Sequence, residues 1–232
     1  MRVTGCQLEG RHALHALAVG LTLIGKALRY LPYFVFTFER LGRQGLGRGR
    51  VRCALAGVDA ASDGQSYPLY APEDRTLRAS DPFERQTVLP AAPEVADTPT
   101  SRVRIELLTP ARLKFEERLA VELPFHVLVR NLLRRVAHLS YFHCGGDPAA
   151  VAFREWIARA QEVRTAGNRL EWFDWERYSG RQQTRMSLGG LLGRVTYEGD
   201  LAPFLPLLRL GEVVHVGKAT SFGLGRYRLH EG

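Results

Sequence analysis

The feature that most constrains the fold is a short motif that occurs twice. Residues 45–51, GLGRGRV, and residues 223–229, GLGRYRL, share the pattern G-L-G-R-x-R-(apolar). Each copy follows a segment with helical spacing of apolar residues, LPYFVFTFERLG before the first and LAPFLPLLRLG before the second, and each leads into an apolar strand-like stretch. A repeated helix, glycine-rich loop and strand predict a tandem pair of related modules.

The second half of the sequence predicts one complete module. Strands are indicated by alternating apolar residues and helices by apolar residues spaced three and four apart. The expected elements, in chain order, are a strand at 102–110, helices at 124–142 and 148–163, strands at 169–179 and 184–199 joined by a turn at Gly180, a helix at 201–211 and a final strand after the glycine-rich loop. Without the short second helix, this order is β-α-β-β-α-β, a ferredoxin-like (RRM-like) module of the α+β class.

The first half predicts only the end of the same order. Residues 13–25 suggest a strand, residues 27–42 a helix and residues 47–58 a closing strand. Because residues 1–44 are too few for a complete module before the loop, we expect this module to lack its N-terminal β and α elements. Either the start is truncated, or the first sheet is completed by a partner.

A proline-rich stretch divides the two halves. Residues 59–100 hold half of the twelve prolines, and proline cannot donate to a helix or sheet ladder. The pattern predicts a connection with a short hairpin around residues 67–70. We therefore expect a partial ferredoxin-like domain at 1–60, a linker or insert at 61–100 and a ferredoxin-like domain at 101–232.

The charge balance favours a polyanionic partner. The chain has 32 basic and 24 acidic residues, a net charge of +8 and a pI near 9.8. Lysine occurs only at Lys26, Lys114 and Lys218, so arginine dominates, and arginine both forks onto phosphate and stacks on bases. Nucleic acid is the first candidate and an anionic membrane surface the second. An arginine-rich genome would also produce this charge without any polyanionic partner.

Three scattered cysteines, Cys6, Cys53 and Cys144, predict neither a disulfide framework nor a zinc site. They are most compatible with a reduced cytoplasmic compartment. No stretch is long and apolar enough to span a membrane, and no histidines have metal-ligand spacing. We accordingly expect no metal, no cofactor and no membrane partner.

The C-terminal loop GKATSFGLGRYR differs from the known nucleotide-binding loops. Its spacing does not match G-x-x-x-x-G-K-[ST], and it precedes a strand where a dinucleotide loop would open a helix. Glycines without Cβ bulk let backbone N–H groups approach phosphates, with side-chain donors beside them. The candidate RNA-binding residues here are Gly217, Lys218, Thr220, Ser221, Gly223, Gly225 and Arg226, with Arg48 and Arg50 in the first copy. The alternative is a turn in which the glycines merely permit tight packing.

A second candidate surface is the segment EWFDWERYSGRQQTR, in which aromatic residues and arginines are interleaved. Stacking on bases and contact with phosphates require these residue types. Alternation places Trp172 and Trp175 on opposite faces, so at least one is expected in the core. Arg181 and Arg185, near the predicted turn, are the better candidates for RNA contact.

Three segments together resemble the RAMP superfamily, and within it the CRISPR-associated endoribonucleases that process precursor crRNA. These segments are VGKATSFGLGRYRL, GLGRGRVRCALAGV and RYSGRQQTRMSLGGLLGRVTYEGDLAPFLPLLRLG; RIELLTPARLKFE is also similar to the opening strand of their C-terminal domain. The resemblance implies two ferredoxin-like domains. It also implies metal-independent cleavage of repeat RNA, in which a 2′-hydroxyl attacks the adjacent phosphate and leaves a 2′,3′-cyclic phosphate and a 5′-hydroxyl.

Such a reaction requires a general base, a general acid and cations for the phosphorane. His215, beside Lys218 at the mouth of the loop, and His143, at the end of a helix, are the catalytic candidates. In many members of the family the catalytic histidine lies early in the first domain, in the part that this chain is expected to lack, so the resemblance assigns no histidine. His12 and His15 flank the expected first strand and are further candidates. His126 and His138 are expected to be packing or surface groups, and His230, near the terminus, is expected to be incidental.

Three functions therefore compete. The first is an endoribonuclease that binds CRISPR repeat RNA and matures crRNA. The second is a non-catalytic crRNA-binding RAMP subunit that assembles with other CRISPR effector subunits. The third is an ordinary ferredoxin-like interaction module whose charge reflects genomic bias.

Overall fold

The chain forms two compact units, Met1–Gln86 and Thr87–Gly232. The structure, a computed structural model, describes residues 2–8, 16–47, 49–62, 65–78, 100–179 and 183–232. Each unit has its own hydrophobic core. Among the described residues, no helix has the length and apolarity needed to cross a membrane.

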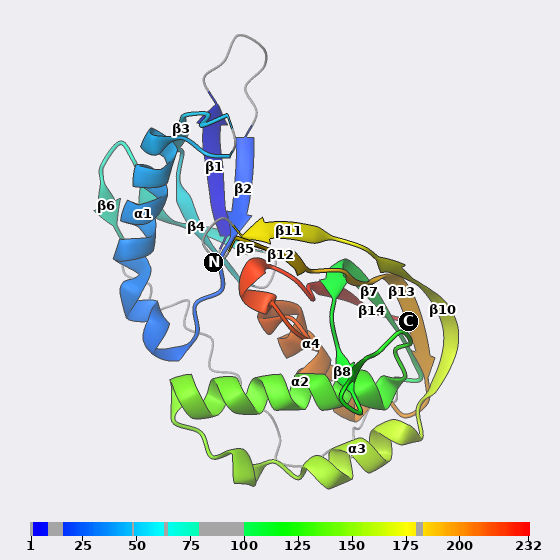
Figure 1. Ribbon diagram of the computed structural model, residues 1–232. Coiled ribbons are helices and arrows are strands. Elements are labelled where there is room, and N and C mark those ends of the chain that lie inside the picture. The colour runs from blue at the N-terminus through cyan, green and yellow to red at the C-terminus, as the bar shows by residue number, and fades with distance from the viewer. Residues whose placement is uncertain (1, 9–15, 48, 63–64, 79–99, 180–182) are drawn as a thin grey trace. The chain divides into compact units, whose positions relative to one another are not determined.

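The second unit contains a four-stranded sheet and three α-helices (Figure 1). Its main elements are β7 (Arg102–Ala111), α2 (Phe125–Leu139), α3 (Phe153–Gln161), β10 (Arg164–Phe173), β13 (Gly190–Glu198), α4 (Leu205–Val214) and β14 (Tyr227–Glu231). The strand order in the sheet is β10-β13-β7-β14, and every neighbouring pair is antiparallel. With α3 as an addition, this is the predicted β-α-β-β-α-β module, and the ferredoxin-like fold class is confirmed.

Strand β7 shows why alternating apolar residues predicted a strand correctly. Val103, Ile105 and Leu107 are at most 3% exposed, whereas the residues between them lie on the other face. Side chains alternate across a strand, so one face of β7 packs into the core with residues of α2, α3 and α4. Each fully buried aliphatic side chain of this kind contributes about 1.5–3 kcal/mol.

The predicted long hairpin is divided into two parts. The strands expected at 169–179 and 184–199 are interrupted, so that a separate ribbon forms from β11 (Glu176–Ser179) and β12 (Thr184–Ser187). Gly189 marks the break, because a Cβ there would lie 2.7 Å from the carbonyl oxygen of Phe173. The turn expected at Gly180 lies outside the described residues.

The first unit is a sheet with one α-helix among its described residues. Its elements are β1 (Arg2–Leu8), β2 (Ala16–Gly20), a 3-10 turn (Gly25–Tyr30), α1 (Leu31–Gln44), β3 (Cys53–Leu55), β4 (Val58–Ser62), β5 (Gln65–Ala71) and β6 (Thr76–Leu77). The path through the sheet is β2-β1-β4-β5-β6, and β3 also pairs with β1. Its core is formed by residues of α1, β3, β4 and β5.

A strand that sequence analysis missed, β1, lies in the middle of this arrangement. It pairs antiparallel with β2 on one side and with β3 and β4 on the other. In a complete β-α-β-β-α-β module, the first strand has this central place. The expectation of a missing first strand is therefore corrected: β1 is present, and among the described residues no helix and no further strand stands between it and β2.

The first unit extends beyond residue 60, the boundary expected from sequence. The hairpin β4–β5 and the short β6 continue its sheet through the start of the predicted linker. Pro68 lies within β5 opposite Asp59, next to a register shift between the two strands. Proline is tolerated in a sheet at such irregularities, which is why proline content misplaced the boundary.

Cys53 is disulfide-bonded, so the prediction of three unbridged cysteines is wrong. The register pairs Cys53 with Leu8 and Cys6 with Leu55 on neighbouring strands. Sequence spacing could not show this proximity, because it depends on the pairing of β1 with β3. Cys144 is free and exposed.

Candidate nucleic-acid interface

The C-terminal glycine-rich loop connects α4 to β14. His215 ends the helix with φ of +62°, and its backbone N–H donates to the carbonyl of Gly211 at 2.8 Å. Few residues with a side chain adopt this left-handed region, so the chain direction at His215 is held by its surroundings. The helix end thereby fixes the position from which the imidazole projects.

The backbone of the loop is hydrogen-bonded to the segment that follows the central strand β7. Lys218 N–H donates to Arg112 O at 2.8 Å, and Gly225 N–H donates to Pro110 O at 3.0 Å. Within the loop, Val216 N–H donates to Gly225 O at 3.0 Å. These donors are therefore occupied and cannot hold a phosphate.

Two of the glycines are required by packing. A Cβ on Gly217 would lie 2.4 Å from Arg112 O, and one on Gly225 would lie 1.8 Å from Val216 O. Both also have positive φ, which disfavours any side chain. Gly223, at φ +82°, faces open space. The packing interpretation thus explains Gly217 and Gly225, while Gly223 is needed only for its backbone conformation.

Thr109 connects the loop to β7 through its hydroxyl. The hydroxyl donates to Gly223 O and accepts from Arg226 N–H, both at 2.9 Å. Thr220 and Ser221, which were predicted as donors, begin a 3-10 turn (Thr220–Phe222) in which Ser221 is exposed and Thr220 half-buried. Sequence reasoning missed Thr109; the only signal was its place before Pro110 at the end of the alternating strand.

Basic residues from three segments contact this loop or belong to it, Arg112 through its backbone carbonyl. Lys218 and Arg226 are exposed in the loop itself, and Arg135 of α2 donates from Nε to Val214 O at 3.2 Å. Arg112 follows β7 and donates from Nη1 to Ser187 O. Its Nε is buried and has no hydrogen-bond partner among the described residues. We call Arg112, Arg135, Lys218 and Arg226 the loop cluster.

Electrostatic effects indicate that Arg226 and Arg135 lie near His215. Burial lowers the pKa of His215, and the charges of Arg226 and Arg135 lower it further, against a backbone hydrogen bond at Leu224 that raises it. The pKa of the Glu117 carboxyl is lowered chiefly by its 2.7 Å hydrogen bond from Lys114, with a smaller effect of Lys218. A half-buried imidazole with a lowered pKa is neutral at pH 7 and can accept a proton.

The other catalytic candidate, His143, lies elsewhere in the same unit. It is exposed in a π-helical turn (Ser140–Cys144) that follows α2. Within the described part of the chain, no hydrogen bond or ion pair connects it to the loop cluster. The structure thus brings His215 together with Lys218 and Arg226, and does not bring His143 to them.

The remaining predicted arginines are placed differently. Arg50 is exposed in the first unit, at φ +45° in a tight turn closed by the pairing of Leu46 with Val51. Arg48 and Arg181 lie outside the described residues. Arg185 lies in β12, but its side chain is not among those described.

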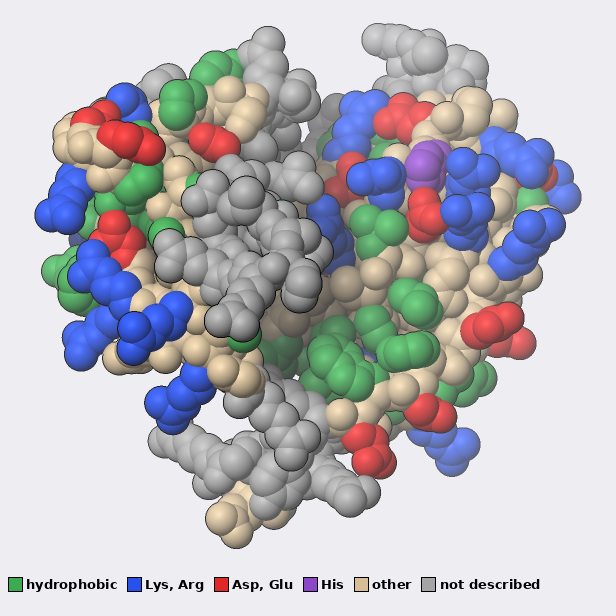
Figure 2. All heavy atoms as spheres, turned by 90° about the horizontal axis from the view of Figure 1, so that it is seen from above, with side chains coloured by type: hydrophobic (Ala, Val, Ile, Leu, Met, Phe, Trp, Pro, Cys, Tyr) green, Lys and Arg blue, Asp and Glu red, His purple; other side chains and the backbone are tan. Residues whose placement is uncertain are grey.

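The exposed face of the second unit's sheet carries a network of charges. Glu106 of β7 pairs with Arg194 at 2.7 Å and with His230 at 3.2 Å. Arg194 is the main reason that the pKa of Glu106 is lowered. Figure 2 shows a surface on which Lys and Arg side chains alternate with Asp and Glu around a histidine. His230, expected to be incidental, therefore belongs to an ion-pair network.

The tryptophans differ from the expectation that Trp172 or Trp175 is in the core. They are 38% and 40% exposed, and Trp156 of α3 is the fully buried tryptophan. Trp172 Nε1 donates to Asp174 at 2.9 Å, beside Phe173, which is 48% exposed. The alternation rule does not apply across Trp172 and Trp175, because β10 ends between them, at Phe173. Among the described residues, no group of three or more His, Cys, Asp or Glu could hold a metal ion.

Two family models match the chain. The model of the CRISPR-associated endoribonuclease Cas6 matches residues 105–227, more than half of the chain, and includes β7, the helices and the glycine-rich loop. A second model, described as an N-terminal domain, matches residues 7–82. The two matches follow the two compact units.

Individual proteins agree with these models. An uncharacterized protein of Archaeoglobus fulgidus is 23% identical over 223 residues, covering 92% of this chain and 66% of its own length. The chain thus spans just under two thirds of this curated relative. A product complex of Cas6 from Thermus thermophilus has a TM-score of 0.56 at 18% identity and covers 98% of this chain and 81% of its own.

A partial Cas6-RT-Cas1–Cas2 complex has a TM-score of 0.52 at 18% identity, with coverage of 100% of this chain and 39% of its own. At these identities the structural matches establish the shared fold. The family-model match over more than half of the sequence establishes more: this chain belongs to the family of the CRISPR-associated endoribonuclease Cas6.

Proposed function

We propose that this chain binds CRISPR repeat RNA and cleaves it to mature crRNA, using the 2′-hydroxyl next to the cut as nucleophile. The products would be a 2′,3′-cyclic phosphate and a 5′-hydroxyl. The observation that carries the proposal is the loop cluster around the half-buried, neutral imidazole of His215. RNA affinity comes mainly from such phosphate contacts.

The reaction divides among the residues present. Lys218 and Arg226 are exposed and supply positive charge to the phosphate as its negative charge grows in the transition state. His215, neutral at pH 7, accepts the proton of the 2′-hydroxyl. Acid–base groups and cations thus suffice for the chemistry, and we propose that cleavage needs no metal ion.

A second proton-transfer group must protonate the leaving 5′-oxygen. If the first unit supplies a histidine, it is His12 or His15, because the sequence has no other in residues 1–86. Both lie outside the described residues. His143 remains the candidate within the second unit.

A non-catalytic role is the second candidate. It is favoured by the hydrogen bond between the His215 ring and the Leu224 backbone and by the use of several loop N–H groups in packing. In that case the protein holds crRNA within a larger assembly of effector subunits, and one structural relative is itself a Cas6-RT-Cas1–Cas2 complex. Either role acts on a transcript, so we propose the cytoplasm as its compartment.

The deciding experiment incubates the purified protein with labelled cognate repeat RNA in EDTA. We expect one cut with a cyclic-phosphate end, abolished in His215→Ala without loss of binding, and binding weakened in Lys218→Ala. His143→Ala, His12→Ala and His15→Ala assign the acid. Tight binding without cleavage would establish the structural role, and absence of binding at low salt would overturn both.

A further inference from the structure

Helix α1 of the first unit exposes aromatic side chains on the face opposite its core. Leu31, Val35 and Gly42 are buried, whereas Tyr33 is 69% and Phe36 is 59% exposed. Large aromatic residues side by side on a solvent-facing helix lose the free energy that burial would give them. Core packing of the first unit does not account for their exposure. A ligand that covers this face would account for it.

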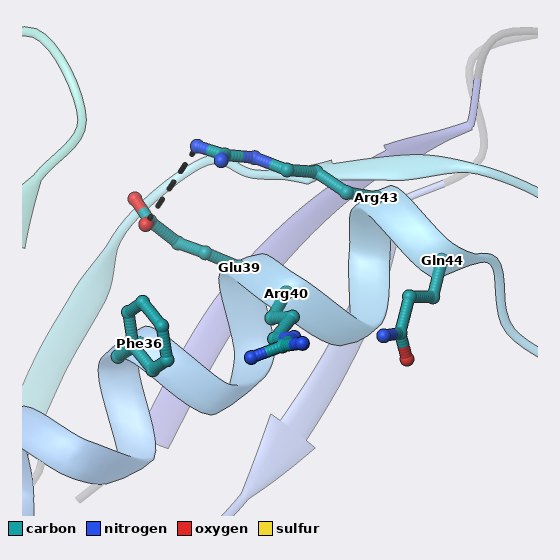
Figure 3. A pocket seen from close by; sticks show the side chains of 5 residues that line it. All are labelled: Phe36, Glu39, Arg40, Arg43 and Gln44. Carbon is teal, nitrogen blue, oxygen red and sulfur yellow. Dashed lines mark ion pairs between the residues drawn. The ribbon is translucent and has the colours of Figure 1, made fainter.

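Arginines flank these aromatics along one face of the helix. Residues three and four apart share a helical face, and the exposed residues Tyr33, Phe36, Arg40 and Arg43 of α1 follow each other at these intervals, while the exposed Arg29 lies in the 3-10 turn just before the helix. We call these five residues the aromatic-arginine stripe. Figure 3 shows Phe36 and Arg40 in one row, with Arg43 turned toward Glu39.

The stripe carries uncompensated positive charge. Its one acidic neighbour, Glu39, accepts a hydrogen bond from the Tyr70 hydroxyl of β5 and lies 4.0 Å from Arg43. The bond to Glu39 raises the pKa of Tyr70. Within the described part of the chain, no carboxylate pairs with Arg29 or Arg40, so both guanidinium groups are available to an anionic ligand.

The surface beside the stripe is hollowed. Phe36, Glu39, Arg40, Arg43 and Gln44 line a hollow of about 390 Å³. A flat ring, guanidinium groups and an amide thus surround one recess. Base stacking uses the ring faces of aromatic residues, and arginines beside them contact phosphates.

We propose that the aromatic-arginine stripe binds a single-stranded segment of RNA. Bases stack on Tyr33 and Phe36, and Arg29 and Arg40 hold the phosphates on either side. A protein-docking face favours a continuous apolar centre without charges, whereas here arginines stand at both ends of a row of exposed aromatics, Tyr30, Tyr33 and Phe36. The proposal rests on the proposed function in that the ligand is a flank of the same repeat RNA.

The test compares two fluorescently labelled RNAs with the full chain. One is the repeat hairpin alone, and the other carries a single-stranded extension at one end, with each end tried in turn. We expect the extension to tighten binding, and Tyr33→Ala/Phe36→Ala to abolish that gain, a loss of about tenfold or more. The control is Tyr141→Ala/Phe142→Ala, a pair of comparably exposed aromatics in the second unit.

A gain in affinity that survives in Tyr33→Ala/Phe36→Ala overturns the proposal, as does the absence of any gain in the wild type. Loss of self-association instead of RNA affinity in the variant would also overturn it, by assigning the stripe to a protein interface. Lys218→Ala separates the two proposals: it should weaken hairpin binding while the gain from the extension persists. Wild-type binding of the hairpin without any gain leaves the proposed function intact.

Two further measurements locate the contact. Arg40→Gln should reduce the slope of log affinity against log salt by about 0.7 for the extended RNA only, whereas Arg154→Gln, an exposed arginine of α3, should leave it unchanged. An extension containing photoreactive 4-thiouridine should crosslink to the tryptic peptide 30–40, which contains both aromatics. Crosslinks confined to the second unit would overturn the proposal.

Discussion

The two copies of G-L-G-R-x-R perform related backbone tasks in different loops. In the second copy, Gly225 packs against Val216 O, and the loop is hydrogen-bonded to the end of β7. In the first copy, Gly45 packs against Arg50 O inside a tight turn closed by Leu46 and Val51. The closely packed glycine is the first of the motif in one copy and the second in the other, because Gly45 aligns with Gly223 and Gly47 with Gly225. The shared sequence therefore does not decide which glycine needs a close backbone approach; the surrounding structure does.

Substitution of Gly225 should have the largest effect on stability. Gly225→Ala places a Cβ 1.8 Å from a carbonyl oxygen at φ +69°. We expect the free energy of unfolding to fall by about 3 kcal/mol or more. Urea denaturation followed by circular dichroism measures the change. A loss under about 0.5 kcal/mol would show that the loop rearranges freely.

Gly45→Ala tests the glycine with the closest backbone contact in the first copy, although the motif aligns Gly45 with Gly223. Its Cβ would lie 2.3 Å from Arg50 O at φ +92°, and we expect a loss of about 2–3 kcal/mol in the first unit. Amide hydrogen exchange should show that the added opening is confined to residues 1–86. Equal loosening of both units would contradict independent roles for the two copies.

The loops should differ in RNA binding. Lys218→Ala removes the positive charge that we propose contacts a phosphate, so the Kd for repeat RNA should rise about tenfold and the salt slope should fall by about 0.7. Arg50→Gln in the first copy tests the same role and should cause a smaller rise. Fluorescence anisotropy over a salt series measures both. An equal effect of both variants would mean that both copies bind backbone phosphates.

Substitution of the glycines that face open space should destabilise the fold less. Gly223→Ala and Gly47→Ala meet no atom within 4 Å but keep positive φ. Each should cost only about 1–2 kcal/mol of backbone strain, measured by the same urea titration. A loss as large as that of Gly225→Ala would show that conformation, rather than contact, sets the cost.

His215 and Glu106 should affect the stability of the fold in different pH ranges. Burial lowers the pKa of His215 in the folded state, so the unfolded chain binds more protons. The contribution of neutral His215 to the free energy of unfolding is fully present above the ordinary histidine pKa of about 6.5. It is lost as the pH falls through the lower pKa that His215 has in the folded state. Glu106 behaves likewise at more acidic pH, since Arg194 lowers its pKa.

The midpoints of urea denaturation, measured at a series of pH values, test these two pH ranges. His215→Gln should flatten the dependence near neutral pH, and Glu106→Gln should flatten it only at the acidic end. A His215→Gln profile parallel to that of the wild type would remove the argument for a neutral imidazole.

Local patterns predicted most of the second unit. The alternation of β7 and the helical spacing of α2 reflect a single dominant core, so their elements were found with bounds close to those observed. β1 was missed because the place of a short strand depends on partners distant in sequence. The same dependence hid the disulfide at Cys53.

The candidate site was predictable only in part. His215, Lys218 and Arg226 are neighbours in the sequence, and the glycine pattern around them suggested the loop. Arg112, Arg135 and Thr109 join it through folding alone, because β7 and α2 are distant from the loop along the chain. Sequence analysis therefore identified the loop but not the residues that hold it.

The central place of β7 has a consequence for biosynthesis. Its two neighbours, β13 and β14, begin at Gly190 and Tyr227, far downstream of Arg102. During translation, one edge of β7 therefore waits for β13 and the other for the last strand, β14, a topology of high contact order that favours slow folding and exposes unpaired edges. The described strands of the first unit all precede residue 78, so they can pair while the ribosome is still synthesising the second unit.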